Sequence, residues 1–183
     1  DISRPGMLHA CVVRSTMARA RIIDIDVSEA SALPGVRAVF VAADLNPDVA
    51  EPWFTLSGRG TPDTPRPPLA EEEVRFVGDP VALVVADDRY IAEDAIELVV
   101  VDYEPLPAVV DYAAADHAEG LVHEGYPGNV VGRLAGPPPE TLDDVFASAS
   151  HVVAETIYQQ GHAAVPLETR GLVVEWSAGS GEL

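Results

Sequence analysis

The pattern of hydrophobic and polar positions predicts two different strands near the start of the chain. Residues 8–14 form a mostly continuous apolar run, which is typical of a strand buried on both faces. Residues 20–27 alternate instead, which indicates a half-buried strand with isoleucine and valine on its inner face. The inward residues that we expect are Ile23, Ile25 and Val27.

A short helix and a long loop are expected next. Residues 28–33 have the composition of a helical turn with Ser28 as its cap, and Pro34-Gly35 ends it. Residues 36–41 are apolar and predict a strand. Residues 46–70 are dense in proline, which fixes φ and lacks an amide donor, so we predict a loop without regular structure.

The middle of the chain has the clearest pattern. Residues 74–77 and 81–86 predict two strands separated by Gly78-Asp79-Pro80, and the wholly apolar second strand should lie centrally in a sheet. A helix then follows Asp87-Asp88, with a stripe of apolar residues at helical spacing, and residues 99–103 predict another strand. The stripe consists of Ile91, Ala92, Ala95, Ile96 and Val99.

The last third of the chain begins with residues 113–140, which are rich in alanine, glycine and proline and predict a linker. Residues 141–149 predict an amphipathic helix capped by Thr141. Its inward residues should be Leu142, Val145, Phe146 and Ala149. Strands are expected at residues 151–158 and 171–176, followed by a turn at 177–181.

Composition limits the classes of partner. The 183 residues include 30 acidic and 11 basic side chains, for a formal net charge of −19 at pH 7, and 48% are hydrophobic. Such an acidic surface repels phosphate backbones and anionic lipids. We therefore expect neither nucleic acid nor a membrane as a partner. With one cysteine and no signal peptide or transmembrane run, the sequence predicts a cytoplasmic location.

Single residues give little evidence of chemistry. Cys11 lies in an apolar run and is interpreted as a small buried hydrophobe. The histidines lack zinc-site spacing, although His117 and His123 could give a loop weak metal affinity or simply be solvated. Gly179-Ser-Gly181 is too short for a phosphate loop. Four carboxylates are explained as helix caps and strand ends, namely Asp87, Asp88, Asp102 and Glu104.

One polar cluster lies between apolar segments, at residues 159–170. Its amide, imidazole, carboxylate and guanidinium groups could line a binding site or form a structural hydrogen-bond network, and we favour the network. The four groups belong to Gln160, His162, Glu168 and Arg170. We therefore assign no catalytic, cofactor-binding or metal-binding residue.

The run from Val74 to Asp111 closely resembles one family, the large, molybdopterin-binding subunits of molybdenum hydroxylases. These are the xanthine dehydrogenases, aldehyde oxidases and carbon monoxide dehydrogenases. The opening motifs resemble the same family: Gly6-Met-Leu-His-Ala10, Val13-Arg-Ser15, Ala20-Arg-Ile22 and Leu33-Pro-Gly-Val36.

The resemblance implies an α+β fold. Residues 1–112 would form an α/β-hammerhead domain, residues 113–140 a linker, and residues 141–183 the opening helix and strands of a molybdopterin-binding domain. The chain would then be an N-terminal fragment of the large subunit, structural and inactive by itself.

For the parent enzyme the resemblance implies hydroxylation of a carbon centre with oxygen from water, or oxidation of carbon monoxide. It implies molybdenum-molybdopterin in the rest of the large subunit, with FAD and 2Fe-2S clusters on partner domains or subunits. An alternative is a free-standing hammerhead module that binds a partner without catalysis. Unpaired strands in residues 151–176 would favour a homodimer.

Overall fold

The computed structural model describes residues 2–48, 66–117, 120–126, 128–130, 140–159, 165, 167–168 and 171–181. Two compact units are distinguished. The larger comprises Arg4–Arg133, and the smaller comprises Asp1–Ser3 with Leu134–Leu183. The mixture of antiparallel sheets and short helices confirms the α+β class.

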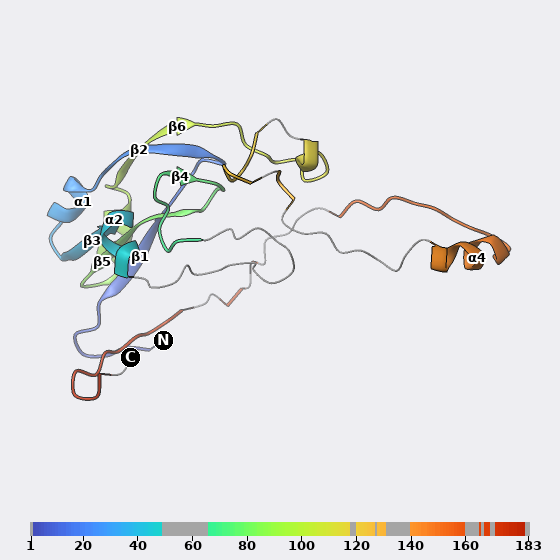
Figure 1. The fold of residues 1–183 in the computed structure, drawn as a ribbon. Coiled ribbons are helices and arrows are strands. Elements are labelled where there is room, and N and C mark those ends of the chain that lie inside the picture. Colours follow the sequence, from blue (N-terminus) through green and yellow to red (C-terminus); the bar gives the residue numbers. More distant parts are fainter. Residues whose placement is uncertain are drawn as a thin grey trace. The chain divides into compact units, whose positions relative to one another are not determined.

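The first sheet has the order β1-β5-β3, with both pairs antiparallel (Figure 1). Strand β5 (Pro80–Ala86) lies between β1 (His9–Arg14) and β3 (Val36–Val41). Four of its seven residues are buried, so the prediction of a central strand from its apolar run is confirmed. The prediction for β1 was wrong in one respect, because β1 is an edge strand and none of its residues is fully buried.

The second sheet has the order β4-β2-β6, again antiparallel. Its central strand is β2 (Ala20–Asp26), flanked by β4 (Glu73–Val74) and β6 (Val100–Pro105). Strand β4 is shorter than the predicted 74–77, because the amide of Arg75 donates to Asp79 Oδ2 at 3.0 Å and leaves the ladder.

The inner face of β2 also differs from the prediction. A shift of register between Ile22 and Asp24 interrupts its pairing with β6, and Ile23 is 54% exposed. Ile25 packs against the core as predicted, and Ile22 packs there in place of Ile23. A bulge adds one residue and so reverses the alternation of faces, which explains why Ile23 points outward.

The hydrophobic core joins the two sheets. Its fully buried members come from β2, from β4, from the segment before β4 and from β5; they are Ala20, Val74, Ala70 and Val81. Partly buried side chains surround them, namely Met17, Ile22, Ile25, Val101 and Tyr103. Because strands distant in sequence supply these residues, the core fixes both sheets relative to each other within the larger unit.

Helix α3 (Arg89–Ile96) packs on the first sheet and buries Ala92 and Ala95, as its apolar stripe predicted. The Asp88 carboxylate caps it by accepting from the Ile91 amide at 2.9 Å, so the predicted capping by Asp88 is confirmed. Asp87 forms no part of the cap and pairs with Arg37.

The short helix α1 (Ser28–Ala32) lacks the predicted cap from Ser28. The Ser28 amide and hydroxyl instead donate to Asp26 Oδ1, at 2.9 and 2.6 Å. The Ser28 hydroxyl is therefore a donor to the preceding carboxylate, and no side chain caps this helix.

The predicted loop 46–70 begins with a 3-10 turn, η1 (Asn46–Asp48), which follows a one-turn helix α2 (Ala42–Leu45) that the sequence did not indicate. Residues 49–65 lie outside the described part. The side chain of Asn46 ties the two ends together, since its amide nitrogen donates to the Leu69 carbonyl at 2.9 Å and its oxygen accepts from the Leu69 amide at 3.2 Å.

In the smaller unit, helix α4 (Glu140–Ser148) is present near the predicted position. Three apolar side chains that were expected to point inward are exposed, namely Leu142, Val145 and Phe146. The strands predicted at 151–158 and 171–176 are not formed. A strand requires a neighbour in a sheet, and in the described part of the chain neither segment belongs to either of the two sheets. The turn at 177–181 is confirmed by a 2.8 Å hydrogen bond from Gly181 N to Ser177 O.

Among the described residues, no helix has both the length and the apolar character needed to cross a bilayer.

Candidate functional site

The polar cluster predicted at residues 159–170 lies mostly outside the described residues. Gln160, His162 and Arg170 lie outside the described residues, and Glu168 is exposed. Whether these groups form a site or a structural network stays a prediction.

The other residues considered from the sequence have structural roles. Asp87 binds Arg37 with two hydrogen bonds of 2.6 and 2.8 Å, and Glu104 pairs with Arg21 across β2 and β6. Cys11 is half-buried on β1, and the pKa of its thiol is raised by burial and by nearby Glu93, against a smaller lowering from Arg89. A raised pKa leaves less of the reactive thiolate at neutral pH, while the half-buried position differs from the full burial expected from the sequence.

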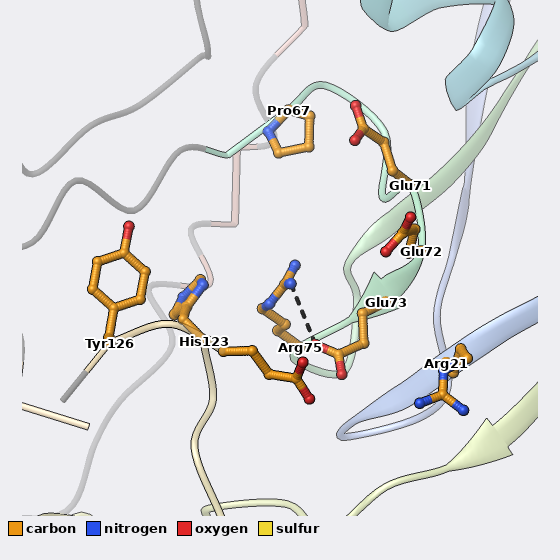
Figure 2. A pocket seen from close by; sticks show the side chains of 9 residues that line it. Arg21, Pro67, Glu71, Glu72, Glu73, Arg75, His123 and Tyr126 are labelled. Atoms are coloured by element: carbon orange, nitrogen blue, oxygen red, sulfur yellow. Dashed lines mark ion pairs between the residues drawn. The ribbon is translucent and has the colours of Figure 1, made fainter. Parts of the chain in front are cut away.

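A cleft of about 430 Å³ lies in the larger unit (Figure 2). One wall is the segment that leads into β4, and the other comes from residues 123–126, far along the chain. It is lined by Arg21, Pro67, Glu71, Glu72, Glu73, Arg75, His123, Glu124 and Tyr126. Four carboxylates thus face two guanidinium groups and one imidazole.

Glu73 is the most buried acidic group of this cleft, with 12% of its side chain exposed. Its Oε1 accepts from Arg19 Nη2 at 3.1 Å, and its Oε2 lies 3.2 Å from Arg75 Nη2. Arg19 is itself 7% exposed. The Glu73 carboxylate therefore compensates the charges of two guanidinium groups from a largely desolvated position. Removal of any one of the three charges would change the electrostatic energy of the other two.

Both arginines also reach the chain that follows β6. Arg19 Nη1 donates to the Pro107 carbonyl at 3.3 Å, and Arg75 Nε donates to the Val122 carbonyl at 3.2 Å. The side chain of Asn129 closes this chain on itself by accepting from the Val122 amide at 2.8 Å and donating to the Gly120 and Ala115 carbonyls.

His123 lies between Tyr126 and Arg75 in Figure 2. Its ring meets that of Tyr126 edge to face, with centroids 5.8 Å apart. Burial lowers the pKa of the imidazole below 6.5, and the charges of Arg75 and Arg19 lower it further, while Glu73 raises it. The neutral imidazole is therefore favoured in this position.

A smaller cavity of about 220 Å³ shares Pro67, Glu73, Arg75 and His123 with the cleft. Arg66 stacks over the Phe76 ring here, at 4.7 Å from its centroid. Burial raises the pKa of Asp79 against the lowering effects of the Arg75 amide and of nearby arginines.

This cleft was not predicted from the sequence. Its two walls are about fifty residues apart in sequence, and neither contains a motif of fixed spacing. The available signals were the run Glu71-Glu-Glu73 beside Arg75, and His123. Only His123, together with His117, had been considered, as a weak metal site, and His117 does not line the cleft.

The lining of the cleft does not suit an anionic molybdenum-pterin cofactor. The described residues include no group of three or more His, Cys, Asp or Glu residues that could hold a metal ion. The carboxylates of the cleft outnumber its guanidinium groups, and Glu73 already compensates Arg75, so an anionic cofactor would be repelled. We therefore derive no chemical step for this part of the chain.

Comparison with known proteins defines the class. The family model described as "Aldehyde oxidase and xanthine dehydrogenase, a/b hammerhead domain" matches residues 1–107, more than half of the chain. The chain belongs to this family, and the hammerhead fold predicted from the resemblance is confirmed.

Individual relatives are large subunits of oxidoreductases. The chain is 38% identical to the nicotine 6-hydroxylase large subunit of Paenarthrobacter nicotinovorans over 176 residues, which are 96% of this chain and 21% of that protein. It is 41% identical to the carbon monoxide dehydrogenase large chain of Afipia carboxidovorans over 197 aligned residues, covering 100% of this chain and 24% of that protein.

Among solved structures, quinoline 2-oxidoreductase from Pseudomonas putida 86 matches with a TM-score of 0.73 and 43% identity, over 84% of this chain and 19% of that one. The Cu,Mo-CO dehydrogenase matches with a TM-score of 0.66 and 42% identity, over 82% of this chain and 20% of that one. The chain thus spans about a fifth of the length of the relatives it matches.

Proposed function

We propose that this chain forms the hammerhead part of the large subunit of a molybdenum-dependent hydroxylase or dehydrogenase, and that its role there is structural. The observation that carries the proposal is the alignment of nearly the whole chain with about a fifth of several such large subunits. The reaction of the whole enzyme would be hydroxylation of a carbon centre with oxygen from water, or oxidation of carbon monoxide.

The division into parts belongs to the same proposal. Residues 1–112 are the hammerhead domain, residues 113–140 a linker, and residues 141–183 the start of the molybdopterin-binding domain. No residue of this chain is catalytic or binds cofactor or metal. The cluster of Gln160, His162, Glu168 and Arg170 belongs to a structural network in the second domain.

The exposed apolar side chains of the smaller unit support this division. Val153, Ile157 and Leu172 are each between 86% and 88% exposed, in segments whose sequences favour strands. Strand-forming segments with such side chains are stable when they pair within a larger sheet. The remaining four-fifths of a large subunit would supply that sheet.

The proposed cofactors of the whole enzyme are molybdenum-molybdopterin in the large subunit, and FAD and 2Fe-2S clusters on partner domains or subunits. The proposed partners are accordingly the rest of the large subunit and the FAD and iron-sulfur components, with a homodimer of the chain itself. The proposed location is the cytoplasm. A relative in Paenarthrobacter nicotinovorans is named subunit gamma of the 6-hydroxypseudooxynicotine dehydrogenase complex, which supports a multi-subunit assembly.

Two measurements test the proposal. The mass of the native polypeptide that contains this sequence should be several-fold above 19.4 kDa. Elemental analysis should then find molybdenum in the native protein and none in the purified 183-residue chain. A native product of 19.4 kDa, or stoichiometric molybdenum in the 183-residue chain, would overturn the proposal.

A further inference from the structure

The smaller cavity differs in charge from the cleft beside it. Three glutamates that line the cleft do not line the cavity, namely Glu71, Glu72 and Glu124. Arg66 lines the cavity and does not line the cleft. The excess of carboxylates that makes the cleft unsuitable for an anion is therefore absent from the lining of the cavity.

The two carboxylates that line the cavity, Glu73 and Asp79, already have partners. Glu73 accepts from Arg19 through Oε1 and pairs with Arg75 through Oε2. Asp79 Oδ2 accepts from the Arg75 amide at 3.0 Å. With both carboxylates ionised, the guanidinium groups of Arg19, Arg66 and Arg75 still exceed them by one charge. This local positive charge lies in a chain whose formal net charge is −19.

Arg66 supplies the charge that has no counter-ion. Its guanidinium stacks on the Phe76 ring, with Cζ 4.7 Å from the ring centroid, and it makes no hydrogen bond or ion pair with another described residue. A guanidinium held flat on a ring keeps its N–H groups directed outward in its own plane. Arg66 is therefore placed to donate to a group in the cavity.

Arg75 adds further donors to the same cavity. Its Nε donates to Val122 O and its Nη2 pairs with Glu73, and no other acceptor among the described residues takes its side-chain N–H groups. A guanidinium has five such groups. The polar part of the lining therefore offers more donors than acceptors, and this excess favours an anionic ligand over a cationic one.

The remaining lining sets the size and shape of the ligand. It is apolar and comes from Pro67, Ala70, Phe76 and Val122, and the volume of the cavity is about 220 Å³. A cavity of about 150 Å³ is large enough to bind benzene. The smaller cavity therefore has room for one ring with one substituent.

We propose that the smaller cavity binds a small carboxylate with a flat apolar body, of the size of benzoate. The carboxylate accepts from Arg66 and from the remaining N–H groups of Arg75, and the ring lies against Pro67 and Val122. Hydrogen bonds between a guanidinium and a carboxylate are about twice as strong as neutral ones. This binding site is additional to the structural role proposed above and does not depend on it.

Three probes of similar size separate charge from shape: benzoate, benzamide and benzylammonium. Each is titrated into the isotope-labelled 183-residue chain, and the amide NMR signals of Phe76 and Val122 are followed. Benzoate should give saturable shifts, benzamide should bind about tenfold more weakly, and benzylammonium should give no saturable shift. Benzoate without saturable shifts, or benzylammonium that binds as tightly as benzoate, would overturn the proposal.

Arg66→Gln and Arg89→Gln make a matched pair, because each removes one exposed positive charge. Arg89 lies on α3, pairs with Glu93 and does not line the cavity. Arg66→Gln should weaken benzoate binding by about tenfold or more, whereas Arg89→Gln should change it by less than about twofold. Equal losses in the two variants would assign the effect to net charge and would overturn the site.

Asp79→Asn tests the sign of the ligand charge in the opposite direction. Asparagine keeps an oxygen that accepts from the Arg75 amide and removes a negative charge from the lining. Benzoate should therefore bind about threefold more tightly or better. Circular dichroism verifies that the variant is folded. Weaker benzoate binding in the folded variant would contradict an anion site.

Discussion

Glu73 and Arg75, separated by one residue in sequence, form an ion pair of 3.2 Å although Glu73 also accepts from the buried Arg19. The pair therefore connects the core, the cleft and the chain that follows β6. Replacing such a carboxylate leaves buried positive charge without compensation, which costs more than the pair itself contributes.

We expect Glu73→Gln to destabilise the chain by about 3 kcal/mol, since Arg19 and Arg75 would lose their shared counter-charge. Urea denaturation followed by circular dichroism measures the change. The matched control is Glu104→Gln, which removes an exposed pair with Arg21 and should cost less than about 1 kcal/mol. Equal effects of the two substitutions would refute the argument from burial.

The N-terminus of α3 gives a second prediction. Asp88→Ala removes the acceptor for the Ile91 amide and should cost about 1 kcal/mol in unfolding free energy. Asp94→Ala is the control in the same helix, where an exposed Asp is replaced by a better helix former and stability should not fall. A loss of stability in Asp94→Ala equal to that in Asp88→Ala would show that the cap is not the cause.

Gly35 precedes β3 with a φ of +93°, and a Cβ added there would lie 2.6 Å from Ile91 Cδ1. We therefore expect Gly35→Ala to lower the free energy of unfolding by about 1–2 kcal/mol, chiefly because alanine is strained in the left-handed backbone conformation. Gly128 has neither a positive φ nor an atom within 4 Å of its Cβ position. Gly128→Ala should accordingly stay within about 0.5 kcal/mol of the wild type, and a comparable loss at both positions would contradict the prediction.

The boundary between what sequence predicted and what it missed has a physical basis. Strand β5 and helix α3 were predicted because each buries a face whose period is visible locally, as the buried Ala92 and Ala95 show. The outward turn of Ile23 was missed because a bulge is fixed by pairing with β6, about eighty residues away.

The site was missed for a similar reason. Glu73 and His123 line the same cleft because the chain after β6 returns to the segment that leads into β4, and no spacing along the chain encodes this proximity. The predicted strands at 151–158 and 171–176 fail in the opposite way: their local pattern favours strands, yet the described residues offer no neighbour for pairing.

Asp26 gives a prediction about pH. The hydroxyl and the amide of Ser28 both donate to its carboxylate and lower its pKa below 3.8. A lowered pKa favours the fold above the ordinary value, and this contribution is lost as the pH falls through the lowered one. In Ser28→Ala the pKa of Asp26 should rise, as measured by carboxyl NMR titration. Ser31→Ala, on the same helix, should leave it unchanged, and a rise there as well would contradict the assignment to Ser28.

The apolar surface of the smaller unit leads to the last prediction. Trp176 is 61% exposed, next to Val173 and Val174 in a segment with strand-forming sequence. Exposed apolar side chains in such a segment should lead the purified chain to associate with a second copy. Light scattering should therefore find a weight-average mass that rises with concentration from 19.4 kDa toward the dimer.

Trp176→Asp should shift this equilibrium toward the monomer, because a charge in the contact must be desolvated on association. Tyr90→Asp is the control, since Tyr90 is an aromatic residue on α3 that is even more exposed, at 76%, and lies outside the segment. A strict monomer at high concentration would rule out this surface as the contact. The same shift from Tyr90→Asp would mean that added charge, rather than loss of the Trp176 contact, separates the copies.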